Sequence, residues 1–339
     1  MEGVARYQDL PLPAGVSLPR DLVGIIEEFD GRLKRGQLGQ YRPIPTGFSP
    51  LDEVLGGGLR AEDLVILGGP YGVGKTIMVL QMAADIARRG DAHALVVCYE
   101  HSQVYLLHRL LCLESIEAQE DHPQGLTLKK IQEIVTGHGG FRGARPSLPG
   151  LQVVLQSSPE ARRAWARITS YWERLLLASG NTLKTTLEVL ETYIRWARAR
   201  GPEVVLFIDY LQKVPFPAIW GGAPLEEDER ISRITAGLKH LAMSYGVPVV
   251  AVGAADTEGL KADRVRLRDM WGPSVVSYEC DMALMLNPLK ETSRRAEGQE
   301  VRLSVDKNRH GPEGLEMVFT MHGPYFAFNP QGRLLRSEE

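Results

Sequence analysis

The residues with the clearest chemical potential form a glycine-rich loop between a short apolar run and a helical pattern. Glycines in such a loop let backbone N–H groups face phosphate oxygens, and the first turn of the next helix, which includes Ile77, adds its positive dipole end. Lys75 can reach the β- and γ-phosphates, and Thr76 can bind Mg²⁺. The loop matches the P-loop pattern G-x-x-x-x-G-K-[ST] at Gly69, Pro70, Tyr71, Gly72, Val73, Gly74, Lys75 and Thr76.

A plain glycine-rich turn before a helix is the alternative interpretation of this loop. The pattern and its position between a strand and a helix agree, however, and together they predict a nucleotide site. ATP is the expected ligand, although nothing in the loop excludes GTP.

Two carboxylates that end apolar strands could complete this chemistry. Asp209 follows Val204–Ile208 (VVLFI), and Glu100 follows Ala94–Tyr99 (ALVVCY). In open parallel sheets, ligands bind at the edge formed by the carboxyl ends of the strands. We therefore expect Asp209 to be the second anchor of Mg²⁺ and Glu100 to deprotonate an attacking water. A helix cap for Asp209 and a solvated loop position for Glu100 are the structural alternatives.

Composition narrows the class of protein. The 339 residues carry 39 basic and 42 acidic side chains, a formal charge of −3, and 44% of them are hydrophobic. These values are typical of globular proteins and exclude a disordered chain, a coiled coil and a generally basic DNA-binding protein. Neither the eight histidines nor the three cysteines have metal-ligand spacing, so we expect Mg²⁺ as the only metal, no disulfide and a cytoplasmic location. No apolar stretch predicts a membrane span.

The order of elements predicts an α/β fold with a mostly parallel sheet and helices on both faces. Helical spacing is expected over Thr76–Arg89. Short apolar runs predict strands at Asp63–Gly68, Ala94–Tyr99, Val204–Ile208 and Val247–Val252. Shorter strands are expected as a C-terminal antiparallel extension at Asp281–Leu286, Glu300–Val305, Glu316–Met321 and Tyr325–Phe328.

Three segments lie outside this core. Residues 1–40 are expected to form an arm, with a helix from Asp21 to about Gly36, and residues 331–339 a tail after a domain at 41–330. Residues 115–180 are expected to be an insertion with helices near 126–135 and 160–177. The first helix carries an apolar stripe, which packs either on its own domain or on a neighbouring subunit, at Leu22, Ile25, Ile26, Phe29 and Leu33.

Several motifs together resemble one family, the DnaB-type replicative helicases, over roughly Arg42 to Phe328 outside the insertion. More distant relatives of the RadA and KaiC kind share the opening segment and the P-loop. The motifs occur in the family's order: Ile44-Pro45-Thr46-Gly47-Phe48 with Leu51-Asp52, the Gly56–Gly58 run, the P-loop, Tyr99-Glu100-His101, Ile208-Asp209-Tyr210-Leu211-Gln212 and Lys307-Asn308-Arg309-His310-Gly311-Pro312.

The resemblance implies a RecA-like P-loop NTPase core and an ATPase that acts on single-stranded DNA. It also implies a homo-oligomer, a hexameric ring with ATP at each subunit junction. Lys307 and Arg309 would then reach as fingers into the neighbour's site, where a cation neutralises charge on the transferred phosphoryl. The helix at Asp21–Gly36 would be the linker helix that packs on an adjacent subunit.

The sequence also departs from the family in two ways. The residues before the core are too few for the family's N-terminal collar domain, so primase binding through a collar is not expected. Gly253-Ala254-Ala255-Asp256 stands where the family places Ser-Gln and then Asn-Arg, so the glutamine that would sense γ-phosphate is missing. This departure favours the second hypothesis, a regulatory or assembly ATPase of the RadA or KaiC kind without unwinding activity.

Two loops could face single-stranded DNA in the channel of such a ring. Pro215–Arg230 carries the acidic run Glu226–Glu229 and should repel phosphates. The basic loop, residues 254–272, alternates cations that an extended backbone would place on one side. These cations either bind along a strand of DNA or are only solvated. The expected DNA-binding residues are Lys261, Arg264, Arg266 and Arg268.

Overall fold

The computed structural model describes residues 18–120, 123–137, 150–156, 158–201, 203–216, 225–289 and 298–335. The chain divides into two compact units, residues 1–39 and 40–339, which we describe separately. The expected arm at residues 1–17 and the end of the tail at 336–339 lie outside the described residues. In the described part, no helix has the length and apolar character needed to cross a membrane.

The first unit contains helix α1 (Leu22–Lys34). Asp21 caps it, because the Asp21 side chain accepts a hydrogen bond from the Gly24 N–H at 2.8 Å. The apolar stripe forms as expected, and its side chains stay exposed, with Leu22 at 75% and Ile26 at 63% of their accessible surface. Such a stripe on a single helix needs a partner surface to become buried.

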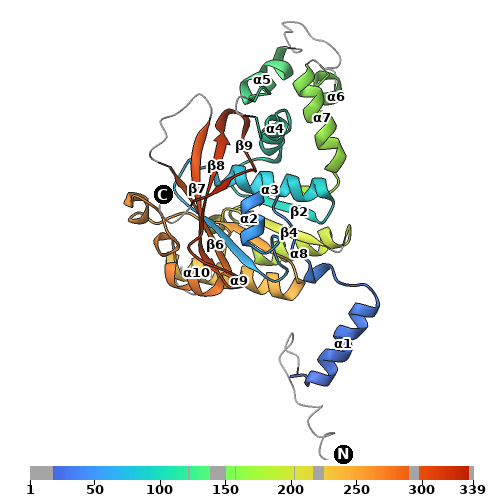
Figure 1. The fold of residues 1–339 in the computed structure, drawn as a ribbon, viewed down its shortest axis with the longest axis vertical. Coiled ribbons are helices and arrows are strands. Elements are labelled where there is room, and N and C mark those ends of the chain that lie inside the picture. Colours follow the sequence, from blue (N-terminus) through green and yellow to red (C-terminus); the bar gives the residue numbers. More distant parts are fainter. Residues whose placement is uncertain are drawn as a thin grey trace, which may run out of the picture. The chain divides into compact units, whose positions relative to one another are not determined.

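The second unit is built around one large sheet (Figure 1). Its parallel part consists of β6 (Met282–Pro288), β1 (Leu64–Gly68), β5 (Val249–Val252), β4 (Val204–Asp209), β2 (His93–Cys98) and β3 (Leu175–Ser179), in that spatial order. The antiparallel part continues beyond β6 as β7 (Gln299–Asn308), β8 (Glu316–His322) and β10 (Arg333–Leu334), with β9 (Ala327–Phe328) also paired to β8. The α/β class and the C-terminal antiparallel extension are confirmed.

Two details of the expected sheet are wrong. The sequence pattern assigns Asp281–Leu286 to the antiparallel extension, but β6 pairs in parallel with β1 and is antiparallel only to β7. The expected helix at 160–177 ends earlier, as α7 (Pro159–Tyr171), and Leu175–Ser179 forms the parallel edge strand β3. A run of three leucines fits a helix or a strand equally well, so periodicity alone cannot place this boundary.

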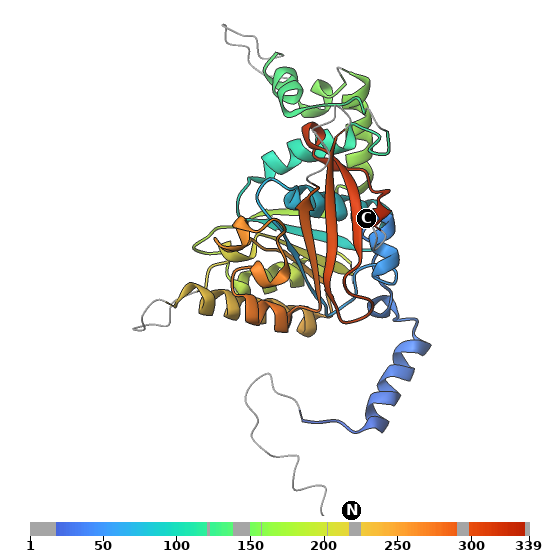
Figure 2. The same cartoon turned by 60° about the vertical axis from the view of Figure 1, so that its left-hand side comes forward.

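Helices cover both faces of the sheet (Figures 1 and 2). Alternate strand residues point to opposite faces, so β1 sends Val65 and Leu67 to one core and Leu64 and Ile66 to the other. The first core includes residues of α2 (Ser49–Val54), α3 (Lys75–Arg89), α4 (Gln103–Glu114), α5 (Leu128–Gly137) and α7, with α6 (Leu151–Val154) packed nearby. The second includes α8 (Leu187–Arg198), α9 (Glu227–Tyr245) and α10 (Pro273–Glu279).

The acidic run has a structural role at the start of α9. Glu226 is the N-cap residue, and Glu227, Asp228 and Glu229 occupy the first turn. Carboxylates at a helix N-terminus stabilise it by about 0.3–1 kcal/mol each, because they face the positive end of the dipole. This corrects the expectation that the run lies in a loop; residues 217–224 of that expected loop lie outside the described part.

A partly buried ionic cluster joins α3 to α4 and α7. Arg88 pairs with both Asp85 and Glu114, and the Tyr171 hydroxyl donates to Glu114 at 2.8 Å. Burial raises the pKa of Asp85 to about 6, and the nearby charge of Glu114 adds to this, while Arg88 opposes it.

The three cysteines form no disulfide with one another. Cys98, Cys112 and Cys280 are all free and buried.

We predict that Asp85→Asn stabilises the fold increasingly as the pH rises from 4 to 6. The pKa of Asp85 is raised in the fold, so the folded state binds more protons than the unfolded chain in this window, and wild-type stability falls as pH rises by up to about 1.4 kcal/mol per pH unit. The difference in unfolding free energy between variant and wild type, measured by urea denaturation at pH 5 and pH 7, should be larger at pH 7. The exposed Asp91→Asn is the control, and an equal difference at both pH values would contradict the prediction.

Candidate nucleotide-binding site

Two glycines shape the P-loop between β1 and α3. Gly69 has a φ of 141°, and a Cβ there would lie 2.1 Å from the carbonyl oxygen of Leu286 on β6. Gly74, with a φ of 98°, is the N-cap of α3, and no side chain caps that helix end. Only glycine adopts these conformations without strain. The N–H groups in the first turn of α3 are therefore available to a phosphate.

Lys75 folds back over the loop. Its ammonium group donates hydrogen bonds to the carbonyl oxygens of Gly69 at 2.7 Å and Pro70 at 2.8 Å. Burial lowers the pKa of Lys75 to about 8, although Asp209 and Glu100 oppose this by favouring the charged form. An anionic ligand bound beside Lys75 would therefore stabilise the charged form of its ammonium group.

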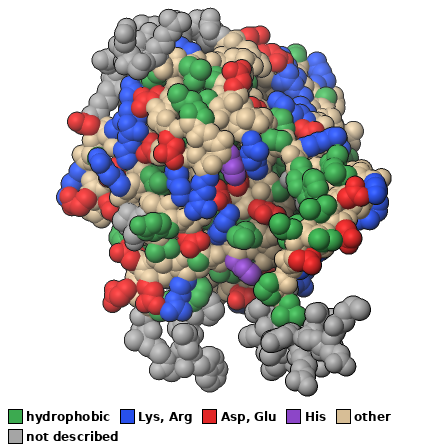
Figure 3. Space-filling model, turned by 60° about the horizontal axis from the view of Figure 1, so that its bottom comes forward, with side chains coloured by type: hydrophobic (Ala, Val, Ile, Leu, Met, Phe, Trp, Pro, Cys, Tyr) green, Lys and Arg blue, Asp and Glu red, His purple; other side chains and the backbone are tan. Residues whose placement is uncertain are grey.

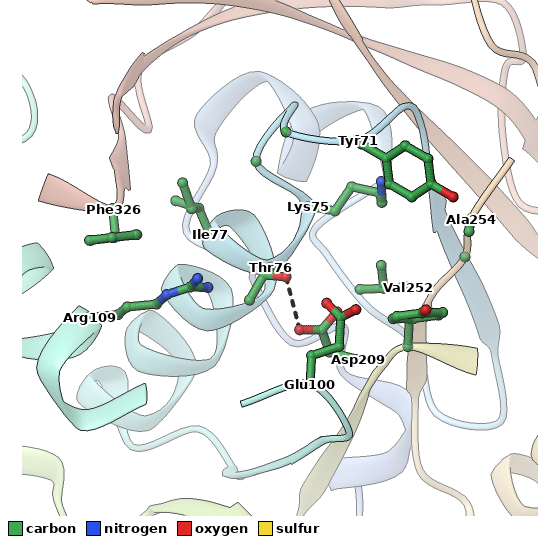
Figure 4. Close-up of a pocket in the computed structure, with 14 residues that line it drawn as sticks. Tyr71, Lys75, Thr76, Ile77, Glu100, Arg109, Asp209, Val252, Ala254 and Phe326 are labelled. Atoms are coloured by element: carbon green, nitrogen blue, oxygen red, sulfur yellow. Dashed lines mark hydrogen bonds between the residues drawn. The ribbon is translucent and has the colours of Figure 1, made fainter. Parts of the chain in front are cut away.

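Thr76, in the first turn of α3, lies next to Asp209, the last residue of β4. The Thr76 hydroxyl donates to Asp209 Oδ2 at 2.9 Å (Figure 4). Asp209 ends β4 with 1% of its surface exposed, and burial raises its pKa, while the hydrogen bonds from Thr76 and Cys98 act in the opposite direction. A buried carboxylate beside a hydroxyl offers the oxygen ligands that Mg²⁺ prefers.

The two residues fit a magnesium site of the phosphate-assisted kind. Within the described ranges, no three carboxylate, histidine or cysteine side chains lie together as a metal cluster. Mg²⁺ commonly takes one or two protein ligands and completes its shell with phosphate and water. The chain would supply Thr76 and Asp209, and a bound nucleotide the rest.

A cavity of about 230 Å³ opens beside these groups. Glu100, two residues after the end of β2, lines it together with Lys75, Thr76 and Asp209, and Figure 4 shows the Glu100 carboxylate next to that of Asp209. The ends of β4 and β5 form another wall, through Tyr210, Gly253 and Ala254. Sequence reasoning named Lys75, Thr76, Glu100 and Asp209 separately, and the structure brings all four together. Of the loop residues expected to bind nucleotide, those that line the cavity are Tyr71, Gly72, Gly74, Lys75, Thr76 and Ile77.

Sequence reasoning missed two residues of the cavity wall. The Arg109 guanidinium on α4 lies between two rings, 4.7 Å from the centroid of Tyr105 and 4.9 Å from that of Phe326. Its Nε is buried without a hydrogen-bond partner in the described structure. Phe326 has a φ of 51°, which is unusual for a bulky residue. An arginine within an apolar helix was the available signal for Arg109, while no local pattern pointed to Phe326.

Lys307 and Arg309 lie at the other edge of the same sheet. Lys307 pairs with Ala283 at the start of β6, whereas the P-loop follows the end of β1. The Lys307 ammonium donates to the carbonyls of Ser277 at 2.6 Å and Cys280 at 2.5 Å, at the C-terminal end of α10. Such carbonyls attract cations. The two residues expected to be fingers are therefore remote from the P-loop of their own chain.

Arg309 is joined to the start of β1 through one carboxylate. It donates to Asp281 Oδ1 at 3.2 Å and to the Tyr278 carbonyl at 2.7 Å, and about half of its side chain stays exposed. Asp281 Oδ2 accepts from the Leu64 N–H at 2.8 Å and from Lys239 at 2.7 Å. The half-exposed Arg309 side chain is thus held in place by the buried Asp281 carboxylate.

The basic loop does not have the extended backbone that would place its alternating cations on one side. Turns of 3₁₀ helix at Gly259–Lys261 and Leu267–Asp269 interrupt it. Arg264 pairs with Glu316, and Arg266 with Asp306 at 2.9 Å, so both guanidinium groups are held against the sheet. Lys261 and Arg268 remain mostly exposed, at 67% and 85% of their side-chain surface. Over the face shown in Figure 3, basic side chains are interspersed with acidic ones.

The chain matches a known family over most of its length. The family model is that of the DnaB-like helicase C-terminal domain, and it matches residues 43–144 and 155–329. Curated relatives include the replicative DNA helicase DnaB of Geobacillus stearothermophilus, 25% identical over 280 residues, and the replicative DNA helicase DnaC of Bacillus subtilis, 25% identical over 283 residues. Each alignment covers 81% of this chain and 54% of the relative, so the chain spans about half the length of these relatives.

Solved structures support the fold. One of them, an isolated ATPase domain, superposes with a TM-score of 0.67 at 19% identity, covering 91% of this chain and 96% of that one. A DnaB-like replicative helicase, solved in a study of its interactions with primase, gives the same TM-score and identity over 92% of this chain and 68% of that one. The expected RecA-like fold and the resemblance to the DnaB family are confirmed.

We predict that affinity for Mg²⁺-ATP falls by up to about tenfold per pH unit above pH 8. The pKa of Lys75 without ligand is about 8, and a bound polyphosphate raises it, so at higher pH a proton must be taken up on binding. Lys75→Arg should bind more weakly but with little dependence on pH between 7.5 and 9.5, because arginine stays charged. Titration with a fluorescent ATP analogue measures both. A wild-type affinity that is flat through this range would contradict the assignment.

Proposed function

Since the chain belongs to the DnaB-like helicase C-terminal domain family, we propose that it is an ATP-hydrolysing motor that assembles into a ring and acts on single-stranded DNA. One observation carries the proposal. A nucleotide pocket with Lys75, Thr76, Asp209 and Glu100 lies at one edge of the sheet, and a fixed, half-exposed arginine lies at the other. An ATPase whose sites lie between copies of the chain would need a nucleotide pocket at one edge and a cation for the neighbouring pocket at the other.

Each residue of the pocket has a role in the proposed hydrolysis. The P-loop N–H groups and Lys75 bind the β- and γ-phosphates, and Thr76 and Asp209 hold Mg²⁺, which neutralises phosphate charge when it is bound. Glu100 accepts the proton of the attacking water, because its carboxylate lies in the cavity beside the two residues that would hold the metal. Arg109 presents its guanidinium to the cavity between two rings, which hold its orientation.

The fingers act between subunits. The first and last residues of β1 are four residues apart, roughly 13 Å at about 3.3 Å per residue, and Arg309 is bonded beyond the start of the strand. A cation fixed there is out of reach of its own phosphates but available to a neighbour's. Repeating one such head-to-tail contact closes a ring, and six copies are the number implied by the family resemblance. The exposed stripe of α1 supplies an apolar surface for a neighbour in the same assembly.

Lys261 and Arg268 of the basic loop are the residues we propose for DNA contact. Both are mostly exposed cations, and the carboxylates that they pair with, Glu258 and Asp269, belong to the same loop. An assembly ATPase without unwinding activity is the second candidate. Ala254 at the pocket wall favours it, because a methyl group cannot form a hydrogen bond with a phosphate. ATP turnover that is indifferent to single-stranded DNA would support this candidate and contradict the motor.

Mixed oligomers test the finger assignment. Lys75→Ala should lose nucleotide binding, and Arg309→Ala should bind nucleotide normally but lose turnover in the assembled state. An equimolar mixture of the two should recover about one quarter of wild-type turnover, because one junction in four joins an intact pocket to an intact finger. Steady-state ATPase assays measure this recovery. A mixture as inactive as its components would show that Arg309 acts on its own chain's site.

Salt dependence tests the DNA contact. Replacing both Lys261 and Arg268 by alanine should lower the slope of log affinity for single-stranded DNA against log salt by about 1.4, since each lost phosphate contact removes about 0.7. Fluorescence anisotropy with a labelled oligonucleotide measures the slope, and stimulation of turnover by the same oligonucleotide should fall. Arg195→Ala on α8 is the matched control, an exposed arginine outside the loop. An unchanged slope in the double variant would exclude these residues as phosphate contacts.

A further inference from the structure

The side-chain amide of Gln212 forms two hydrogen bonds to one residue of the pocket wall. Its Oε1 accepts from the Ala254 N–H at 3.2 Å, and its Nε2 donates to the Ala254 carbonyl at 3.4 Å. Gln212 lies in a 3₁₀ turn, Leu211–Lys213, three residues after Asp209. Ala254 follows β5 and begins the basic loop. One amide group therefore joins the ends of two neighbouring strands, β4 and β5, both of which line the cavity.

Gln212 is itself held in place. Arg230, in the first turns of α9, donates from Nη2 to the Gln212 carbonyl at 2.8 Å and from Nη1 to the Val214 carbonyl at 3.0 Å. Glu227 pairs with Arg230 and fixes the guanidinium. The Gln212 side chain is half-buried, and both of its polar atoms are used. The short turn is therefore attached to α9 through its backbone and to Ala254 through the Gln212 side chain.

The basic loop is closed at its neck, directly beside this contact. The Trp271 N–H donates to the Ala254 carbonyl at 3.3 Å, Ala255 and Met270 form a β-bridge, and the Asp256 N–H donates to the Asp269 carbonyl at 2.9 Å. A shift of Ala254 is therefore transmitted to both strands of the neck. Lys261 and Arg268 lie beyond that neck.

The far side of the loop has a similar amide contact that does not involve the cavity. Asn287 on β6 accepts from the Val265 N–H at 2.8 Å and donates to the Val265 carbonyl at 2.9 Å. Asp306 on β7 adds bonds to Arg266 and to the Leu267 N–H. The loop is thus attached to the sheet at one end and to the nucleotide pocket at the other.

We propose that Gln212 is the positioning residue that couples the nucleotide site to the basic loop. Ala254 has no polar side-chain atom, so the state of the pocket can reach the loop at this wall only through the backbone that Gln212 holds. Asp209 would hold Mg²⁺, and a nucleotide in the cavity would meet the wall that Ala254 forms, so ligand binding would bear on the two strand ends that the amide joins. Gln212 is not among the residues that line the cavity and acts through Ala254. The proposal rests on the proposed function for its biological use, but the coupling itself needs only nucleotide binding.

Hydrogen exchange on the full chain tests the coupling. Amide exchange of residues 254–271 is measured by mass spectrometry without nucleotide, with Mg²⁺-ADP and with Mg²⁺-ATPγS. The wild type should show a difference in exchange between the two nucleotides. Gln212→Met, which keeps the length and loses both hydrogen bonds, should exchange faster in every state and lose that difference, while its affinity for Mg²⁺-ATPγS stays unchanged.

Asn287→Leu is the matched control on the same loop. It also removes a double amide contact and should raise exchange, but it should keep the difference between the nucleotides. If it does not fold, Gln81→Met replaces it, since Gln81 forms the same pair of bonds to Phe328 at 2.7 and 2.9 Å away from the loop. Loss of the difference in the control as well would reduce Gln212 to a structural contact and overturn the proposal.

The outcome is separable from that for the proposed function. Wild-type exchange that is the same with both nucleotides, or a Gln212→Met variant that keeps the difference, overturns the coupling even when ATP hydrolysis is normal. Absence of hydrolysis overturns the motor but leaves the exchange result readable, because ATPγS needs only to bind. Where single-stranded DNA stimulates the wild type, Gln212→Met should retain the basal turnover and lose the stimulation.

Discussion

Parallel pairing of the central strands is the constraint on which the rest of the structure depends. Because β1, β2, β4 and β5 run the same way, their carboxyl ends meet at one edge, and the P-loop, Glu100, Asp209 and Ala254 converge there. The same polarity sends the amino ends, with Asp63 and Asp281, to the opposite edge. One sheet therefore separates the candidate nucleotide pocket from a surface that presents cations.

The sequence was informative where local pattern and chemistry coincide. The P-loop pattern, with the strand before it and the helix after it, and the carboxylates at strand ends, predicted a pocket whose principal residues do lie together. Long-range pairing was harder to predict. Nothing local to Met282–Pro288 reveals that it is parallel to one neighbour and antiparallel to the other, and the leucines of β3 fit either period. Arg109 and Phe326 meet only through packing of α4 against the C-terminal strands.

The three-dimensional structure changed the interpretation of the charged residues most. The acidic run that suggested a repulsive loop serves the first turn of α9, and two arginines that suggested a strand-tracking surface are neutralised by Asp306 and Glu316 on the antiparallel strands. Counting charges along a segment assumes that each is solvated, which holds only when no carboxylate from a distant strand lies nearby. Within the basic loop, Lys261 and Arg268 retain the exposure that the count assumed.

Asp281 connects the start of β1 to Arg309. Its carboxylate binds the first N–H of the strand and also Arg309, while the last residue of the strand leads into the P-loop. In the proposed ring, any displacement of Arg309 by phosphate release next door would pull on one end of a five-residue rod whose other end carries this subunit's own phosphate loop. The polarity of a single strand would then set the direction in which the state of one site influences the next.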